Sequence, residues 1–131
     1  MFVFRLDTRS GVPPYLQLVQ QVRQGVLLGF LRAGDRLPLI REVVETLAIN
    51  PNTVAKAYRQ LEQETLVVGR PGHGTFVTGA SSSTVSPAIY TSLRRGLYGW
   101  LQRAYAAGLD EQAVDALFVA VHHETRAEDV A

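Results

Sequence analysis

Apolar residues recur at helical spacing in the first half of the chain, with polar residues between them. Residues 14–30 are predicted as a helix, because an apolar residue returns every three or four positions. The residues expected on its apolar face are Tyr15, Leu18, Val19, Val22, Val26 and Phe30. A turn is expected at residues 33–35, and a second, short helix is expected after Pro38.

A third helix is predicted to begin at residues 50–51 and to end near Thr65. Asn50 is a favoured N-cap, and Pro51 suits the first helical position because its missing N–H is not needed there. Residues 66–70 and 75–77 are predicted strands, joined by a turn whose glycines permit a tight reversal. A further short strand is expected at residues 2–4. Three helices followed by a β-hairpin form a winged helix-turn-helix domain.

The clearest change in composition lies at residues 79–87, which are small, polar and aperiodic and predict a linker. Residues 87–107 are predicted as a long helix, and Asp110 is expected to cap a second one after a break at Gly108. The predicted domains are therefore a winged helix-turn-helix over residues 1–78, a linker over 79–86 and a two-helix region over 87–131. The fold class is mostly α with a small β-wing.

The first C-terminal helix is apolar over about half of its circumference. Its hairpin partner cannot cover that surface, so the remainder must meet the winged domain, a ligand or another subunit. A two-fold homodimer is the commonest solution. The predicted dimerisation residues are Ile89, Leu93, Leu97, Trp100, Leu101, Tyr105, Val114, Leu117, Phe118 and Val121. An aromatic ligand pocket is the alternative use of Tyr90, Tyr98, Trp100, Tyr105 and Phe118, and packing is favoured over it.

Composition narrows the class of protein. Of the 131 residues 47% are hydrophobic, as in a folding globular chain, and there is no cysteine, which excludes disulfides and thiolate metal sites. The N-terminus is charged too early for a signal peptide, and no apolar run approaches the roughly 20 residues that span a bilayer. We therefore expect a cytoplasmic protein without a membrane partner.

Charge is distributed unevenly along the chain, although the net charge is only +1. Residues 1–78 contain nine Lys and Arg against six Asp and Glu, whereas residues 79–131 contain four against six. The basic part suits an anionic partner. The chain offers no nucleophile–His–carboxylate set, no phosphate-binding loop and no paired carboxylates in a plausible cleft, so we expect neither an enzyme nor a cofactor. His122 and His123 are adjacent and point apart on a helix, which favours a solvated helix end over a metal site.

The third helix has one face without a carboxylate. Val54, Ala57, Tyr58 and Leu61 share the apolar side of the helix, and Glu62 and Glu64 only flank the polar one. An ordinary solvated face is the alternative, but such faces usually interleave Glu with Lys. Amides, a hydroxyl and cations are the groups that contact bases and phosphates in the major groove of double-stranded DNA. The polar face consists of Asn52, Thr53, Lys56, Arg59, Gln60 and Gln63.

Residues 14–77 resemble the GntR family of bacterial regulators. The matching motifs are Gly34-Asp35-Arg36-Leu37-Pro38, Arg41-Glu42, Asn50-Pro51-Asn52-Thr53-Val54-Ala55-Lys56-Ala57-Tyr58-Arg59-Gln60-Leu61-Glu62 and Gly72-His73-Gly74-Thr75-Phe76-Val77. The resemblance implies that Arg41 on the second helix contacts DNA, together with Asn52, Thr53 and Lys56 on the third. It implies that Gly72, His73 and Gly74 form a wing tip that reaches the minor groove or the backbone. Arg36 and Arg70 are either neighbours of phosphates or structural ion-pair donors.

Two residues depart from the family pattern. Leu39 stands where relatives carry a Ser that caps the second helix and donates to phosphate, and the loss of such a cap costs about 1 kcal/mol. Thr65 stands where relatives carry Gly at the end of the third helix. If that backbone is left-handed, the β-branched side chain is strained by about 1–2 kcal/mol.

The short tail resembles the two-helix tail of the YtrA-type branch of the family, which serves dimerisation. This resemblance implies a DNA-binding transcription regulator, expected to be a homodimeric repressor on a pseudo-palindromic operator, with a small-molecule effector of unidentified chemistry left open. Two alternatives remain. One is the truncated winged part of a pyridoxal-phosphate-linked regulator, and the other is a winged helix used only for protein contacts.

Overall fold

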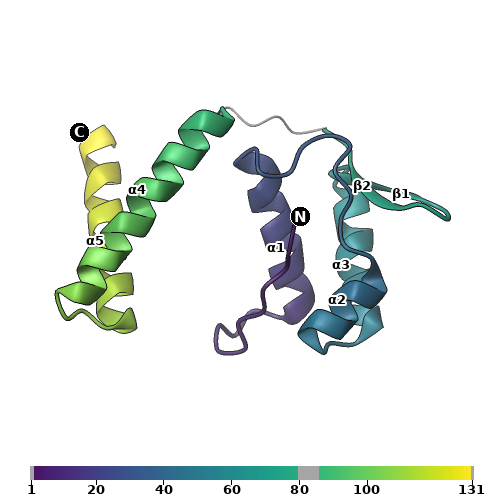
Figure 1. Cartoon of the computed structure of the whole chain (residues 1–131), viewed down its shortest axis with the longest axis horizontal. Coiled ribbons are helices and arrows are strands. Elements are labelled where there is room, and N and C mark those ends of the chain that lie inside the picture. Colours follow the sequence, from purple (N-terminus) through teal and green to yellow (C-terminus); the bar gives the residue numbers. More distant parts are fainter. Residues whose placement is uncertain (1, 80–85, 131) are drawn as a thin grey trace. The chain divides into compact units, whose positions relative to one another are not determined.

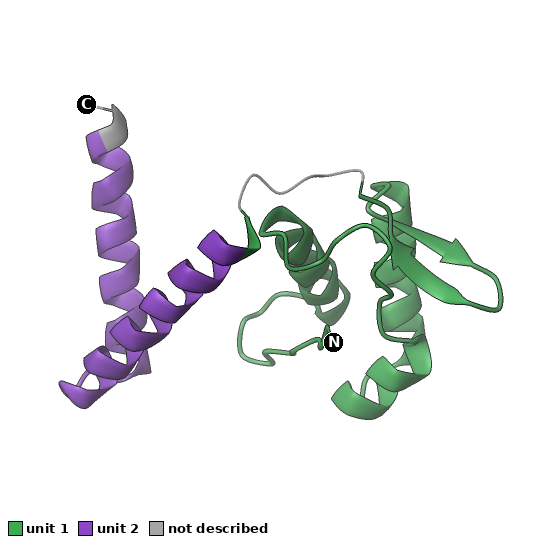
Figure 2. Ribbon diagram, turned by 45° about the horizontal axis from the view of Figure 1, so that its top comes forward, with its two compact units in different colours: residues 1–87 green, residues 88–131 purple. Residues whose placement is uncertain are grey.

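The computed structural model describes residues 2–79 and 86–130, and it divides the chain into two compact units, residues 1–87 and 88–131 (Figure 2). The first unit contains the helices α1 (Pro14–Leu27), α2 (Ile40–Leu47) and α3 (Pro51–Gln63), followed by the strands β1 (Val67–Arg70) and β2 (Gly74–Val77) (Figure 1). The second unit contains α4 (Pro87–Ala106) and α5 (Glu111–Val130). Among the described residues, no helix has the length and apolar character that crossing a bilayer requires.

The core of the first unit lies where α1, α2 and α3 meet. It is built from the apolar faces of these helices, from Leu31 and Leu37 between the first two helices, from single residues of both strands and from one residue of the N-terminal segment. Fully buried Leu18, Val22 and Leu61 are among its members, so the predicted apolar faces of the first and third helices meet each other. The fold class predicted from the sequence, mostly α with a small β-wing, is confirmed.

The wing is an antiparallel pair in which Val67 lies opposite Val77 and Arg70 opposite Gly74. The other edge of β2 is also occupied, because the main chain of residues 34–37 bonds to it. The N–H of Leu37 donates to the Thr75 oxygen and the N–H of Val77 to the Asp35 oxygen, each at 2.8 Å. The wing is thereby attached to the segment that leads into α2.

The first helix ends earlier than the pattern predicted. α1 stops at Leu27, because Gly29 adopts a left-handed backbone (φ +78°) and the Leu31 N–H closes onto the Gly25 oxygen at 2.9 Å. Phe30, expected on the apolar face, is therefore 51% exposed, and Leu31 enters the core in its place. Gly25 provides the room, since a Cβ there would lie 2.9 Å from the Leu31 side chain.

The strand predicted at residues 2–4 is wrong. The segment has no regular secondary structure, and among the described residues it pairs with no strand. Side chains of α1 satisfy the main chain that follows it: Gln21 accepts from the N–H of Arg5 at 2.8 Å and donates to its oxygen at 2.6 Å. Gln17, which is almost fully buried, makes a similar pair with Asp7, at 2.8 Å in both directions. The side-chain amides of Gln17 and Gln21 thus bond to main-chain groups that would otherwise pair with a neighbouring strand.

The second unit is a helical hairpin. The 20-residue α4 ends before Gly108, which has a φ of +102°, and the Asp110 carboxylate accepts from the Ala113 N–H at 2.8 Å to cap α5. The predicted break and cap are both confirmed. The proposed linker, residues 79–86, falls largely on residues 80–85, which lie outside the described residues.

Candidate nucleic-acid interface

The third helix begins as its sequence predicts. The Asn50 side chain accepts a hydrogen bond from the Asn52 N–H at 2.8 Å, and Pro51 occupies the first helical position. The turn before it is made possible by Ala48, which caps α2 in a left-handed conformation (φ 54°). The two helices of the helix-turn-helix thus meet through a short, well-capped connection.

Tyr58 connects α3 to the segment that leads into α2 through a hydrogen bond. Its ring is buried in the core, and its hydroxyl donates to the main-chain oxygen of Pro38 at 2.5 Å. Burial, assisted by the negative charge of Glu42, raises the pKa of the Tyr58 phenol well above its ordinary value, so the hydroxyl stays a donor. The orientation of the third helix is therefore fixed from its buried side.

The carboxylate-free face of α3 is turned outward. Asn52, Lys56 and Arg59 are exposed, whereas Thr53 and Gln60 are half-buried. Arg41, one residue after the start of α2, is also exposed. Exposed amides and cations on adjacent helices are what contact with a nucleic acid requires.

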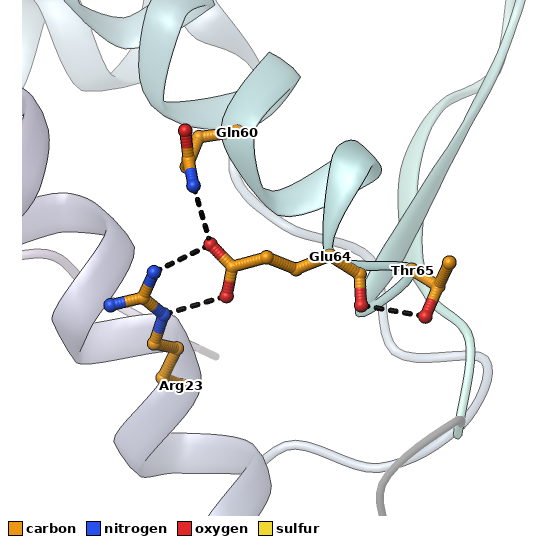
Figure 3. A network of polar contacts seen from close by, with 4 residues as sticks. All are labelled: Arg23, Gln60, Glu64 and Thr65. Atoms are coloured by element: carbon orange, nitrogen blue, oxygen red, sulfur yellow. Dashed lines mark hydrogen bonds and ion pairs between the residues drawn. The ribbon is translucent and has the colours of Figure 1, made fainter.

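Gln60 belongs to a polar network at the C-terminal end of α3 (Figure 3). Its amide donates to the Glu64 carboxylate at 2.9 Å. The same carboxylate accepts both arms of the Arg23 guanidinium, from Nε at 2.7 Å and from Nη2 at 2.6 Å, and this joins α3 to α1. A side chain predicted to face DNA is here engaged within the protein.

Lys56 also makes a contact with α1. Its ammonium nitrogen lies 3.9 Å from the centre of the Tyr15 ring, which is half-buried in the first turn of that helix. By its spacing Lys56 belongs to the polar face of α3, whereas Tyr15 was predicted only on the apolar face of the first helix. The first turn of α1 therefore lies next to the polar face of α3.

The wing tip has the conformation that its glycines predict. Gly72 and Gly74 have φ values of +79° and +120°, and the His73 N–H closes the turn onto the Arg70 oxygen at 2.9 Å. His73 is exposed at this tip. The Arg70 guanidinium lies over the Phe76 ring at 5.3 Å. The wing therefore carries both a cation, Arg70, and an exposed imidazole, His73.

Leu39 occupies the N-cap position of α2 and supplies no side-chain cap, as predicted. The Glu42 carboxylate accepts from the Leu39 N–H at 3.2 Å, which satisfies one donor at this helix start. The Leu39 side chain is half-buried, and a Cβ at Gly74 would lie 3.6 Å from it. Leu39 therefore approaches the wing instead of capping the helix.

Thr65 has the left-handed backbone that the family pattern implied, with a φ of 61°. The N–H of Leu66 donates to the Leu61 oxygen at 3.1 Å and the N–H of Thr65 to the Glu62 oxygen at 2.9 Å. These are the two hydrogen bonds of a Schellman motif, in which Gly is the usual residue at this position. Thr65 is therefore a β-branched residue in the strained left-handed conformation.

The helical hairpin exposes the apolar side chains that the sequence assigned to dimerisation. Among them, Leu93 is 65% exposed and Leu97 is 48% exposed, while Val114 is buried at 4% between the two helices. Trp100 and Leu101 are half-buried. The same face carries a shallow apolar groove lined by Leu97, Trp100, Leu117, Phe118, Val121 and His122. Exposed fractions of Ile89, Tyr105, Leu117, Phe118 and Val121 lie between 41% and 55%.

Three helices, an outward polar face on the third and a glycine-tipped wing define a winged helix-turn-helix protein. The family model for bacterial regulatory proteins of the gntR family matches residues 14–77. The HTH-type transcriptional repressor YtrA of Bacillus subtilis is 33% identical over 108 residues, which cover 82% of this chain and 83% of YtrA. The chain therefore belongs to the GntR family, and it is a transcription regulator rather than an enzyme.

Solved structures agree with this assignment. A transcriptional antiterminator from Listeria monocytogenes superposes with a TM-score of 0.57 at 29% identity, covering 92% of this chain and 90% of that one. YtrA from Sulfolobus acidocaldarius, a GntR-family transcription factor, superposes with a TM-score of 0.52 at 28% identity, over 94% of this chain and 99% of its own. The similarity extends over the helical hairpin as well as the winged unit.

Proposed function

We propose that this protein is a sequence-specific DNA-binding repressor that acts as a homodimer on a pseudo-palindromic operator. The observation that carries the proposal is the exposed, carboxylate-free stripe of Asn52, Lys56 and Arg59 on α3, beside exposed Arg41 on α2. Amides can distinguish bases in the major groove, and cations bind phosphates and guanine. A winged helix used only for protein contacts has no need of such a stripe.

Each predicted contact has a separate role in this proposal. Asn52, Thr53 and Lys56 enter the major groove, and Arg59 contacts the phosphate backbone at its edge. Gln60 supports the groove-facing residues through its bond to Glu64 instead of contacting a base. Gly72, His73 and Gly74 bring the exposed wing tip to the neighbouring groove or backbone.

Dimerisation is assigned to the region 87–131, and the DNA-binding domain to residues 1–78, with 79–86 as the linker. The support is the row of exposed apolar residues on the hairpin, since monomeric proteins rarely leave a continuous surface of this kind in water. A two-fold dimer places two third helices against half-sites about one helical turn apart. The relative named YtrA in Bacillus subtilis is a repressor, which favours repression here.

The alternative of a fragment of a pyridoxal-phosphate-linked regulator receives less support. The alignment with YtrA covers 82% of the chain, so it continues beyond the winged unit into the helical hairpin. A winged domain cut from a pyridoxal-phosphate-linked regulator would not be expected to share the helical hairpin with YtrA.

The test is selection of bound duplexes from a random-sequence DNA pool by the purified full-length protein, followed by affinity measurements over a range of salt concentrations. We expect an enriched motif with two-fold symmetry and a negative slope of log K against log salt, because phosphate contacts release counterions. Light scattering on the same sample should give the mass of a dimer. Absence of enrichment at any salt concentration would refute the proposal.

A further inference from the structure

Tyr15 and Lys56 form a contact between α1 and the DNA-facing stripe of α3. The ammonium of Lys56 lies over the face of the Tyr15 ring, 3.9 Å from its centre. Tyr15 packs against the core of the winged unit, so its ring is held from the protein side, whereas Lys56 is exposed. A fixed ring therefore offers one face to an otherwise flexible cation.

The chemistry of this contact differs from that of an ion pair. The negative face of an aromatic ring attracts a cation, but it carries no net charge and so leaves the charge of the ammonium intact. An ammonium has three N–H donors, and a ring face occupies only one side of it. Within residues 2–79 and 86–130, the structure gives Lys56 no carboxylate partner. Lys56 is thus held in place while its charge and donors remain available.

We propose that Tyr15 is a positioning residue of the DNA interface, whose ring holds the Lys56 ammonium on the outward side of α3 both in the free protein and on DNA. The inference rests on the proposed function. A lysine side chain on a flexible four-carbon stem loses rotamer freedom when its end is fixed on a phosphate or a base. The ring restricts that freedom before binding, so less is lost when the complex forms.

Two other roles of Tyr15 would give different results. Its hydroxyl could donate directly to a phosphate, in which case the ring face would be incidental. The ring could instead compete with DNA for the ammonium, in which case the contact would have to break on binding. Substitutions that separate the ring from the hydroxyl distinguish all three roles.

The experiment compares the full-length protein with Tyr15→Phe, Tyr15→Leu, Lys56→Met and the double variant Tyr15→Leu with Lys56→Met. The probe is the tightest-binding duplex recovered by the selection described above. Tyr15→Phe keeps the ring face and should bind as the wild type does. Tyr15→Leu should bind about two- to ten-fold more weakly per winged domain, because the free Lys56 side chain must then lose its rotamer freedom on binding. The double variant should bind no more weakly than Lys56→Met alone.

Three outcomes would overturn the proposal. If Tyr15→Phe lost as much affinity as Tyr15→Leu, the hydroxyl would be the contacting group. If Tyr15→Leu bound DNA more tightly, the ring would compete with DNA. If Tyr15→Leu weakened binding equally in the Lys56→Met background, the ring would act through the core alone.

A measurement without DNA separates this proposal from the proposed function. The ε-methylene protons of Lys56 should show a ring-current shift in the NMR spectrum of the free protein, retained in Tyr15→Phe and lost in Tyr15→Leu. Absence of that shift in the wild type would refute the positioning role even if DNA bound normally. A normal shift in a protein that binds no duplex would instead refute the proposed function.

Discussion

The carboxylate of Glu64 accepts two hydrogen bonds from the guanidinium of Arg23, at 2.7 Å and 2.6 Å, and so ties the C-terminal end of α3 to the middle of α1 (Figure 3). The two residues are 41 positions apart in the sequence. The hydrogen bond from Arg23 is the main cause that lowers the pKa of Glu64, and burial of the carboxylate opposes it. This pair connects the C-terminal end of α3, whose polar face is proposed to bind DNA, to α1.

Substitution Glu64→Gln should make stability less dependent on pH in the acid range. The pKa of Glu64 is lowered on folding, so its contribution is present at neutral pH and is lost as the pH falls through the folded pKa, below the ordinary value of 4.5. Because the pair is partly exposed, the contribution at neutral pH should be about 0.5–1 kcal/mol. Thermal melts of both proteins between about pH 7 and pH 3 measure it, and a difference that stays constant would contradict the assignment.

Thr65→Gly should raise the free energy of unfolding by about 1 kcal/mol, because Gly removes the cost of a β-branched residue in a left-handed conformation. The observed φ of 61° and the Schellman hydrogen bonds to Glu62 and Leu61 are the basis of this expectation. Thr65→Ala is the matched control, because it removes the same hydroxyl but keeps a Cβ. Equal melting temperatures for the Gly and Ala variants would show that backbone strain is not the cause.

Leu39→Ser should provide the missing cap of α2, with the new hydroxyl accepting from an N–H of the first helical turn. Compared with Leu39→Ala, which loses the same half-buried side chain, the Ser variant should be more stable by about 1 kcal/mol. It should also bind the selected duplex more tightly than the wild type, because a hydroxyl at a helix start can donate to a phosphate. Chemical denaturation and fluorescence anisotropy measure the two effects. Weaker DNA binding by Leu39→Ser would mean that contact with the wing matters more than the cap.

Arg41→Ala and Asn52→Ala should affect DNA binding in different ways. A phosphate contact carries no sequence information, so the loss of Arg41 should weaken binding to every duplex. It should also reduce the magnitude of the slope of log K against log salt by about one. The loss of Asn52 should flatten the base preference at one position of each half-site by about 1–3 kcal/mol. Anisotropy titrations against the selected duplex and its single-base variants distinguish them. Unchanged affinity and preference in both variants would exclude α3 as the sequence-determining helix.

Leu93→Glu should convert the proposed dimer into a monomer. Leu93 is 65% exposed within one chain, so a charge at this position should leave the hairpin folded but should be costly in a dimer interface. Arg95→Glu, at an exposed position two residues away, is the control for added negative charge. Light scattering with circular dichroism separates assembly from folding. A Leu93→Glu protein that kept its dimeric mass would remove this face of α4 from the interface.

The elements whose causes are local were predictable from the sequence. Asn50 begins a helix because its side chain accepts an N–H of the first turn that has no partner within the helix, and Asp110 caps α5 in the same way. Pro51 suits the first helical position because no N–H is needed there. The apolar face of α3 and the glycine turn of the wing follow from spacing and from allowed backbone angles. Each of these depends on residues within a few positions of each other.

Tertiary structure decided what depends on partners distant in the sequence. Residues 2–4 have strand-forming side chains, but Gln17 and Gln21 of α1, and not a neighbouring strand, satisfy the main chain that follows them. Phe30 continues the helical period and yet Leu31 is buried, because the chain has already turned at Gly29.

The surroundings of the polar face of α3 also depend on partners distant in the sequence. Lys56 and Gln60 share a polar face by their spacing, but only the packing of α1 against α3 places Tyr15 beside the first and the Arg23–Glu64 pair beside the second. No local signal marks Tyr15 or Arg23, because a cation–π contact and a bidentate ion pair depend on where two helices cross. The sequence by itself determined which residues face outward from α3, and the crossing of the helices decided which of them are held in place.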